Sequence, residues 1–213
     1  MLGLAEYFAK VPKAQRRRTM IFIGTDGHHQ VTPGGYGRVW LVENREKYFA
    51  KTALMINDEH PSEALIHGND GWSNTTVPLD WYAGGSSRPE LEKIAGDAFH
   101  ELGVSVWAHP SQTPPSGDLG PFYWFLPGVV AQANDFRYMH TNGDTPEDVP
   151  WSGLESVTRA YAKIVDEVNK LPLSALQRPA EENPTAPGSP RGYLPSLANC
   201  QAWVNDSSNG CKP

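Results

Sequence analysis

Imidazole and carboxylate side chains lie in the loops that follow three apolar runs of this sequence. The candidate donors are His28 or His29 after the first run, Glu59 after the second and His140 after the last. Zinc and similar divalent cations accept imidazole and carboxylate ligands in proteins. The sequence therefore predicts a metal site on which one donor from each of these three loops converges.

Asp144 is a candidate partner for the last of these histidines. It lies four residues beyond His140, across a turn that an Asn-Gly pair favours. A metal-bound imidazole usually donates its second N–H to a carboxylate or a carbonyl, which fixes the ring. Asp144 or Thr145 is equally suited to be the N-cap of a helix that starts at Pro146, and the two roles are compatible.

Each of these donors also has an ordinary interpretation. A histidine after a strand is commonly a hydrogen-bonded loop residue, and Asp58 with Glu59 is typical of a solvated turn. The spacing alone leaves both interpretations open.

Strands and helices must alternate along the chain to bring such donors together. Short continuous apolar runs predict buried strands, and apolar residues three or four positions apart predict helices. The resulting order favours an α/β layer fold, in which loops beyond the carboxyl ends of the strands hold the chemistry. The expected strands are 19–24, 52–57, 104–107 and 128–131, the expected helices are 1–10, 38–49, 89–102 and 151–171, and an irregular insert with two short strands is expected over 61–87.

Two of the predicted helices carry apolar faces that the rest of the chain must cover. The face of the helix over 1–10 consists of Leu2, Leu4, Ala5, Phe8 and Ala9, and that of the helix over 151–171 consists of Trp151, Leu154, Val157, Tyr161, Ile164, Val165, Val168 and Leu171.

Composition excludes several classes of protein. The 213 residues suit one domain, or one domain and a tail. With 18 basic and 24 acidic residues the net charge is -6, so we expect no nucleic-acid partner, and the run 16–18 of three arginines is expected to be a solvated loop. No apolar run approaches the length of about 18 residues that a membrane span requires.

The last part of the chain differs in composition from the rest. We expect a domain over 1–172 and a Pro-rich tail over 173–213. Cys200 and Cys211 lie in this tail, where they could close a small disulfide loop or remain free thiols.

Four segments, in order along 1–172, resemble the zinc peptidases of clan MH, family 28. This family includes aminopeptidases, glutamate carboxypeptidases and, by fold, glutaminyl cyclases. The most specific of the four, which precedes the long predicted helix, is similar to the family's segment with the last zinc ligand. The segments are His140-Thr141-x-x-Asp144-Thr145-Pro146-Glu147-Asp148, the run 21–24 with its polar loop and 37–44, the stretch 53–60, and Gly117-Asp118-Leu119-Gly120-Pro121-Phe122.

The resemblance implies a three-layer α/β fold, with a mostly parallel mixed sheet between helices and one or two zinc ions. It places zinc ligands at Glu59 and His140, and Asp118 lies in the family's acidic loop. Phe122, Trp124 and Tyr138 are then candidates for the wall of a substrate pocket, because they lie near the Asp118 and His140 loops.

The chain also departs from the family. Where relatives carry two adjacent glutamates, this sequence has Gly27-His28-His29, which puts His28 at the position of the general base and His29 at a ligand position. Asp26 is an alternative base. The His-x-Asp and Asp-Asn segments that precede the first helix in the family are absent. We therefore expect the C-terminal part of such a domain, incomplete at its N-terminus and impaired as a catalyst.

Three functions follow as hypotheses. The first is a zinc-dependent, aminopeptidase-like hydrolase of peptide or amino-acyl substrates, or a fragment of one. The second is a non-catalytic binding domain of the same fold, which the His28-His29 pair favours. The third is a carbohydrate- or surface-binding module, because 7 Trp and 8 Tyr are present. Family members are often secreted or periplasmic, yet the first residues do not form a signal peptide, so the compartment is left open.

Overall fold

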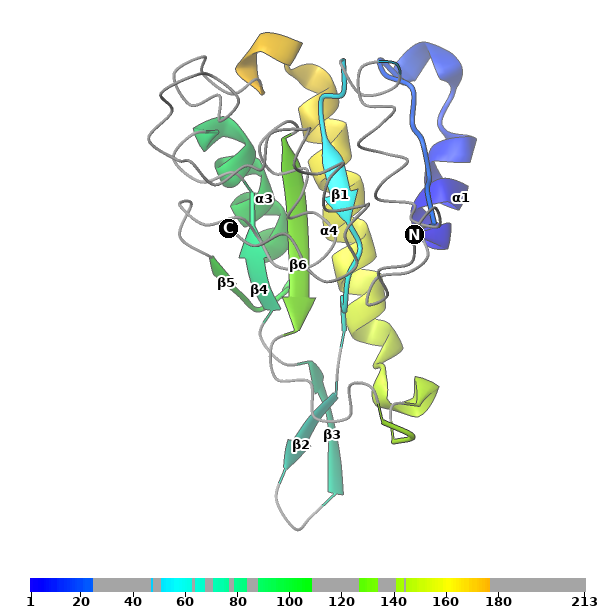
Figure 1. Cartoon of the computed structure of the whole chain (residues 1–213), viewed down its shortest axis with the longest axis vertical. Coiled ribbons are helices and arrows are strands. Elements are labelled where there is room, and N and C mark those ends of the chain that lie inside the picture. The colour runs from blue at the N-terminus through cyan, green and yellow to red at the C-terminus, as the bar shows by residue number, and fades with distance from the viewer. Residues whose placement is uncertain are drawn as a thin grey trace, which may run out of the picture.

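A four-stranded mixed sheet with two helices across one of its faces forms the centre of the computed structural model (Figure 1). The structure describes residues 1–24, 47, 51–62, 64–67, 71–76, 79–83, 88–108, 127–133, 141–143 and 145–176. Short 3-10 turns occur at η1 (Lys13–Gln15), η6 (Pro146–Asp148) and η7 (Leu173–Ala175).

The sheet has the strand order β1-β6-β4-β5. β1 runs parallel to β6, β6 runs antiparallel to β4, and β4 runs parallel to β5. In the β1–β6 pair Met55 lies opposite Gly128 and Asn57 lies opposite Val130. The strands are β1 (Met55–Asn57), β4 (Leu79–Tyr82), β5 (Val106–Ala108) and β6 (Gly128–Ala133).

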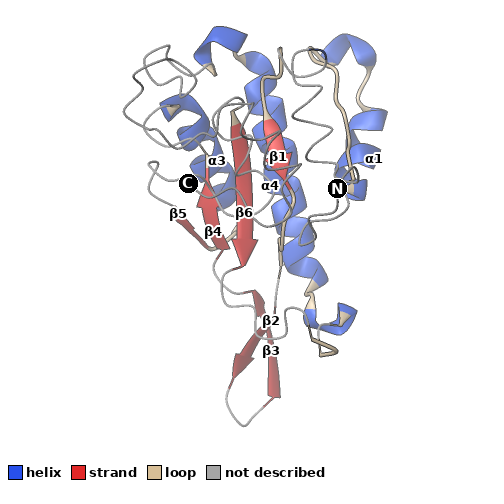
Figure 2. Cartoon of the chain, viewed as in Figure 1, coloured by secondary structure: helices blue, strands red, loops and turns tan. Residues whose placement is uncertain are grey.

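The segment expected to be an irregular insert contains three strands rather than two. β2 (Ala64–His67) and β3 (Gly71–Thr76) form a separate antiparallel hairpin that extends away from the main sheet (Figure 2). β4 joins the main sheet instead, where Trp81 is buried. Sequence pattern predicted one strand too few here, because strands as short as the four residues of β4 show no clear alternation.

α3 (Pro89–Glu101) confirms the helix expected over 89–102. Proline occupies its first turn, where a missing N–H costs nothing, and Glu90 and Glu92 complement the helix dipole there. Leu91, Ala95, Ala98 and Phe99 are buried, and Ile94 is partly buried. Gly103, at φ 68, reverses the chain after the helix in the left-handed conformation that glycine adopts without strain.

α4 (Trp151–Lys170) is the longest helix, as the sequence predicts. Val157, Tyr161, Ile164 and Val168 are buried against the sheet and α3. The expected apolar stripe is wrong at its start, because Trp151 is 75% exposed and Leu154 is also exposed. The first turns of α4 extend past α1 and α3 (Figure 1).

α1 (Leu2–Lys10) lies along α4 and buries a narrower face than expected. Leu4 and Phe8, one turn apart, are buried, whereas Leu2 is 83% exposed. Gly3 faces α4, where a Cβ would meet Cγ2 of Thr158 at 3.4 Å, an ordinary van der Waals contact. The broad face was overestimated because α1 packs mainly on a single neighbouring helix.

The apolar run 19–24 is not a buried strand, which corrects the prediction. No strand is formed there in the described part of the chain, and Ile21 and Phe22 are 57% and 43% exposed. An apolar run predicts an extended, buried segment only if a neighbouring strand pairs with it. Sequence pattern carries no information about that pairing partner.

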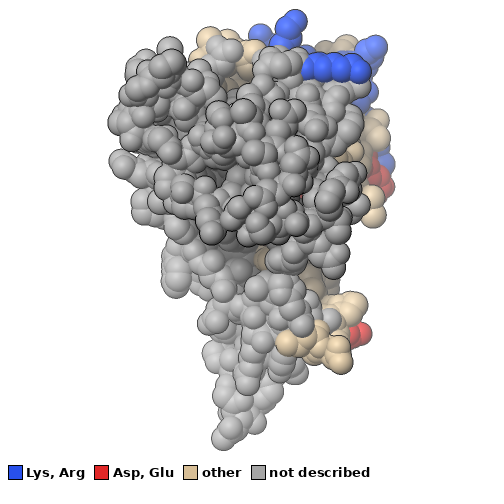
Figure 3. Space-filling view, viewed as in Figure 1, with Lys and Arg blue, Asp and Glu red and all other residues tan. Residues whose placement is uncertain are grey.

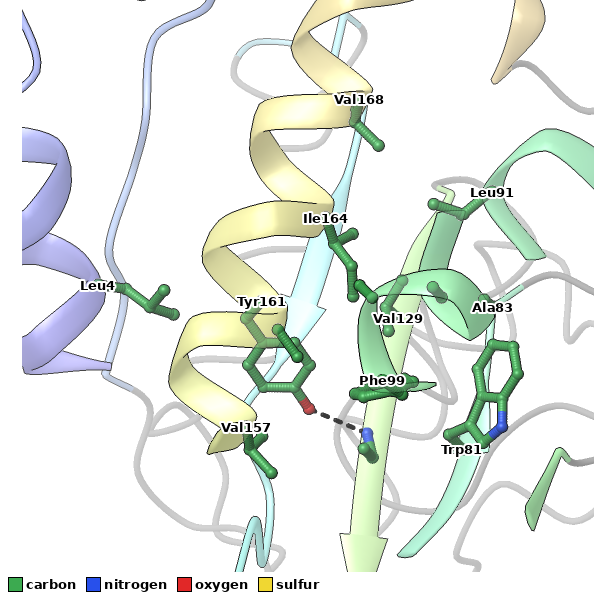
Figure 4. Packing of buried hydrophobic residues seen from close by; sticks show 14 of the residues in the cluster. Leu4, Trp81, Ala83, Leu91, Phe99, Val129, Val157, Tyr161, Ile164 and Val168 are labelled. Atoms are coloured by element: carbon green, nitrogen blue, oxygen red, sulfur yellow. Dashed lines mark hydrogen bonds between the residues drawn. The ribbon is translucent and has the colours of Figure 1, made fainter. Parts of the chain in front are cut away.

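Phe99 lies at the centre of the core between the sheet and the helices (Figure 4). Its ring makes edge contacts with Trp81 of β4, with centroids 5.5 Å apart, and with Tyr161 of α4, at 6.3 Å. Val129 and Ala131 of β6 face the same cluster. Aromatic edge contacts of this kind fix the relative positions of the elements that carry them.

The arginine run 16–18 lies in a loop, as expected, but two of its side chains bind the C-terminal end of α4. Arg18 donates from Nη1 to the carbonyl of Val168 (2.7 Å) and from Nη2 to that of Leu171 (2.5 Å). Arg17 donates from Nη1 to the carbonyl of Lys170 (3.3 Å). Figure 3 shows Lys and Arg side chains gathered at this end of the molecule.

Candidate functional site

Three residues with ionisable side chains follow the carboxyl end of β1. β1 and β6 are parallel, and ligands of α/β sheets bind beyond the carboxyl ends of such strands. Asn57 ends β1, and Asp58, Glu59 and His60 follow it directly. Two carboxylates and an imidazole therefore leave the sheet at one point.

The carboxylate of Glu59 is held by the last residue of β1, Asn57. The side-chain amide of Asn57 donates from Nδ2 to Oε2 of Glu59, at 2.6 Å. A hydrogen bond to a charged carboxylate is stronger than one between neutral groups. Both side chains are half-buried, so the bond restricts the directions in which the carboxylate can point.

His60 turns the chain immediately after this carboxylate. Its φ of 44° lies in the left-handed region, where histidine is tolerated better than most side chains. The buried Ser62 then donates its hydroxyl to the carbonyl of Pro150, at 3.0 Å, just before α4 begins. The segment after β1 is thus tied to the start of α4.

Asp58 forms a second connection at this point. Its Oδ2 lies 2.6 Å from the N-terminal ammonium group of Met1. This ion pair joins the beginning of α1 to the end of β1.

Tyr161 of α4 reaches the same strand end from the core. Its hydroxyl accepts a hydrogen bond from the N–H of Ala131 (3.0 Å, Figure 4) and donates a longer one to the carbonyl of Asn57 (3.4 Å). Asn57 lies opposite Val130 in the parallel β1–β6 pair. In this register the N–H of Ala131 and the carbonyl of Asn57 face each other at the last rung of the ladder. The hydroxyl therefore connects both strands at the point where β1 ends.

Tyr161 stays neutral under ordinary conditions. Complete burial raises the pKa of its hydroxyl strongly, and the negative charges of Asp58 and Glu59 raise it further, whereas the N–H of Ala131 acts in the opposite direction. A neutral phenol keeps its proton, so it can donate to Asn57 and accept from Ala131 at the same time.

The segment around the predicted ligand His140 is described only in part. Thr141 accepts a hydrogen bond at Oγ1 from the N–H of Gly143 (3.2 Å), in the turn that the sequence predicts. The helix expected from Pro146 is the short turn η6. A hydrogen bond from the Thr145 side chain lowers the pKa of Glu147 in that turn.

Of the ten predicted site residues, only Glu59 lies where the structure describes the chain. The convergence of His29, Glu59 and His140 therefore stays a prediction. Within the described ranges, no group of three or more His, Cys, Asp or Glu side chains could hold a metal ion. The residues outside the described ranges are Asp26, His28, His29, Asp118, Phe122, Trp124, Tyr138, His140 and Asp144.

Sequence analysis missed the roles of Asn57 and Tyr161. A polar residue at the end of an apolar strand, two positions before Glu59, was a usable signal for Asn57. Tyr161 was placed correctly on the apolar stripe of its helix, but only the packing shows where its hydroxyl goes.

Comparison with models of protein families, with curated proteins and with solved structures finds no match for this chain. The resemblance to family 28 thus depends on the four sequence segments alone. Among the described helices, none combines the length and the apolar character needed to cross a membrane.

Proposed function

We propose that this chain is a zinc-dependent peptide hydrolase domain of the aminopeptidase type, or a C-terminal portion of one, with Glu59 among its metal ligands. The observation that carries the proposal is the position of Glu59. It lies two residues beyond the end of a strand that pairs in parallel with its neighbour, and its carboxylate is oriented by Asn57. The three-layer α/β architecture belongs to the same proposal.

The donor chemistry at the end of β1 fits a divalent cation. Carboxylate oxygen is an accepted zinc ligand, and ligating carboxylates commonly accept a hydrogen bond from a neighbouring group as Glu59 does. In the proposal His29 and His140 supply the remaining ligands, and Asp144 and Asp118 support them. A bound zinc ion would supply Lewis acidity and lower the pKa of a bound water molecule.

The other residues have assigned roles in this proposal. His28, or Asp26, accepts the proton of the attacking water. Phe122, Trp124 and Tyr138 line the pocket for an apolar side chain of a peptide or amino-acyl substrate. The single neutral imidazole at the base position is expected to give a slow enzyme, because it brings no negative charge next to a dication.

Metal content and hydrolysis test the proposal together. The purified chain is dialysed against zinc, then against zinc-free buffer, and is assayed with aminoacyl p-nitroanilides. We expect stoichiometric zinc in the native chain and at least a tenfold lower affinity in Glu59→Gln, which keeps the shape but removes the charge. Glu155→Gln is the matched control, because Glu155 is an exposed carboxylate of α4 that pairs only loosely with Arg159, at 3.7 Å.

Two results would decide against the enzyme. A folded chain that retains no zinc contradicts the metal site and favours the non-catalytic binding domain. If Glu59→Gln and Glu155→Gln change zinc retention equally, Glu59 is not a zinc ligand.

A further inference from the structure

The carboxylate of Glu59 is connected to the helical layer through one residue, Asn57. The backbone carbonyl of Asn57 accepts from Tyr161, and its side-chain amide donates to Glu59. Tyr161 is 104 residues away in the sequence. We infer that Asn57 and Tyr161 are positioning residues that fix the Glu59 carboxylate at the carboxyl end of β1; the inference rests on the proposed function of Glu59 as a ligand.

The core holds the side chain of Tyr161 in one position. Its ring is fully buried and makes an edge contact with Phe99, which is itself fully buried. Close-packed interiors leave such a ring a single orientation. The position of its hydroxyl is thus set by the core, and the last rung of the β1–β6 pair is set by that hydroxyl.

Strand ends fray when nothing holds their last rung. β1 is only three residues long, so loss of one rung would free a large part of it. The Tyr161 hydroxyl contacts both sides of that rung, at the N–H of Ala131 and the carbonyl of Asn57. Asn57 consequently keeps a fixed backbone, from which its side chain reaches Glu59.

The left-handed turn at His60 makes this positioning necessary. Because the chain changes direction directly after Glu59, regular strand pairing does not continue to hold Glu59 itself. The short bond from Asn57, at 2.6 Å, restricts the direction of the carboxylate beyond the end of the strand. Groups that orient a metal ligand in this way typically contribute 10- to 100-fold to metal affinity.

The test uses Asn57→Ala and Tyr161→Phe with matched controls on the same chain. Tyr7→Phe removes the hydroxyl of an exposed tyrosine that bonds to Asp166, and Asn169→Ala removes an amide on α4. Zinc affinity is measured by competition with a chromophoric chelator. We expect about a tenfold loss in Asn57→Ala, a smaller loss in Tyr161→Phe and no change in the controls.

A double-mutant cycle separates positioning from a general structural effect. If Asn57 acts through Glu59, the loss caused by Asn57→Ala should disappear in a Glu59→Gln background. Equal losses in both backgrounds, or none in the native background, would overturn the inference.

A native chain that takes up no zinc would overturn the proposed function only. Hydrogen exchange still tests the positioning role in that case, because it requires no metal. The amide of Ala131 should exchange at least tenfold faster in Tyr161→Phe than in Tyr7→Phe, because only the first variant loses its hydroxyl contact. Unchanged exchange of that amide would show that Tyr161 does not hold the rung, and the positioning role would then be wrong.

Discussion

Replacing Arg18 by alanine should loosen the C-terminal end of α4. The last four carbonyls of a helix have no partner within the helix, and the negative end of the helix dipole lies there. Arg18 supplies two donors and a positive charge at that point, with contacts of 2.7 and 2.5 Å to Val168 and Leu171. Its segment is far from α4 in the sequence, so the bond also fixes the loop after α1.

The loss of stability expected in Arg18→Ala is the difference between favourable and unfavourable contributions of the Arg18 side chain. A charged hydrogen bond contributes about 1.5–3 kcal/mol, and a cation at a partly buried helix end up to about 2 kcal/mol. Ordering the arginine side chain costs about 2 kcal/mol. Burial lowers the pKa of Arg18, as does the like charge of Arg17, which indicates that the charge is partly desolvated and repelled. We therefore expect a net loss of about 1.5 kcal/mol in Arg18→Ala.

Urea unfolding followed by circular dichroism measures this loss. For a chain of this length, about 1.5 kcal/mol corresponds to a decrease of roughly 3–6 °C in Tm. Arg18→Lys should lie between the native chain and Arg18→Ala, because lysine keeps the charge but cannot donate to two carbonyls in the same plane. Arg17→Ala should cost less than about 0.5 kcal/mol, since it removes one exposed contact of 3.3 Å.

Two outcomes would refute this reasoning. Equal stability of Arg18→Ala and Arg17→Ala would mean that the paired contacts do not hold the helix end. Full stability of Arg18→Lys at both low and high salt would mean that the planar geometry of the guanidinium does not matter.

Two further predictions concern the core. Phe99→Ala should lower the free energy of unfolding by about 3–5 kcal/mol, because Phe99 is fully buried between Trp81 and Tyr161. A shift of the urea midpoint that corresponds to less than about 1 kcal/mol would contradict the central position of its ring. Alkaline pH should destabilise the chain through Tyr161. The pKa of its hydroxyl is raised on folding, so this stability is fully present below the unfolded value of about 10 and is lost as pH rises above it. The free energy of unfolding, measured at intervals from pH 9 to 11, should fall less steeply in Tyr161→Phe than in the native chain, and equal slopes would contradict the assignment.

Helix position and helix face were predicted unequally well from the sequence. The bounds of α3 and α4 agree with the predicted ranges to within one residue, because apolar spacing and the proline of α3 are local signals. The faces were less accurate, since Leu2 and Trp151 satisfy the spacing but are exposed. Spacing defines the direction of a side chain on a helix, but the length of the neighbouring elements decides whether that direction is covered.

The strands were also predicted unequally well from the sequence. The run that ends at Asn57 was predicted to be a strand, and its last three residues form β1. The run 19–24 has a similar composition and forms no strand in the described chain. Strand formation requires hydrogen bonds to a second segment, and that segment is not encoded in the run itself.

At the candidate site, the local sequence alone predicts that Glu59 follows the end of a strand, and it contains a polar amide, Asn57, two positions before Glu59. Both follow from the order of residues 57–59, because side chains on the same side of an extended chain are two positions apart. The contact of Tyr161 with Asn57 and Ala131 joins three elements that are distant in the sequence, and it exists only because α4 packs across β1 and β6. Neighbouring residues in the sequence thus determine which polar groups lie at the end of β1. Tertiary packing alone determines how rigidly that end is held, because the group that holds it must come from a part of the chain that the core keeps in place.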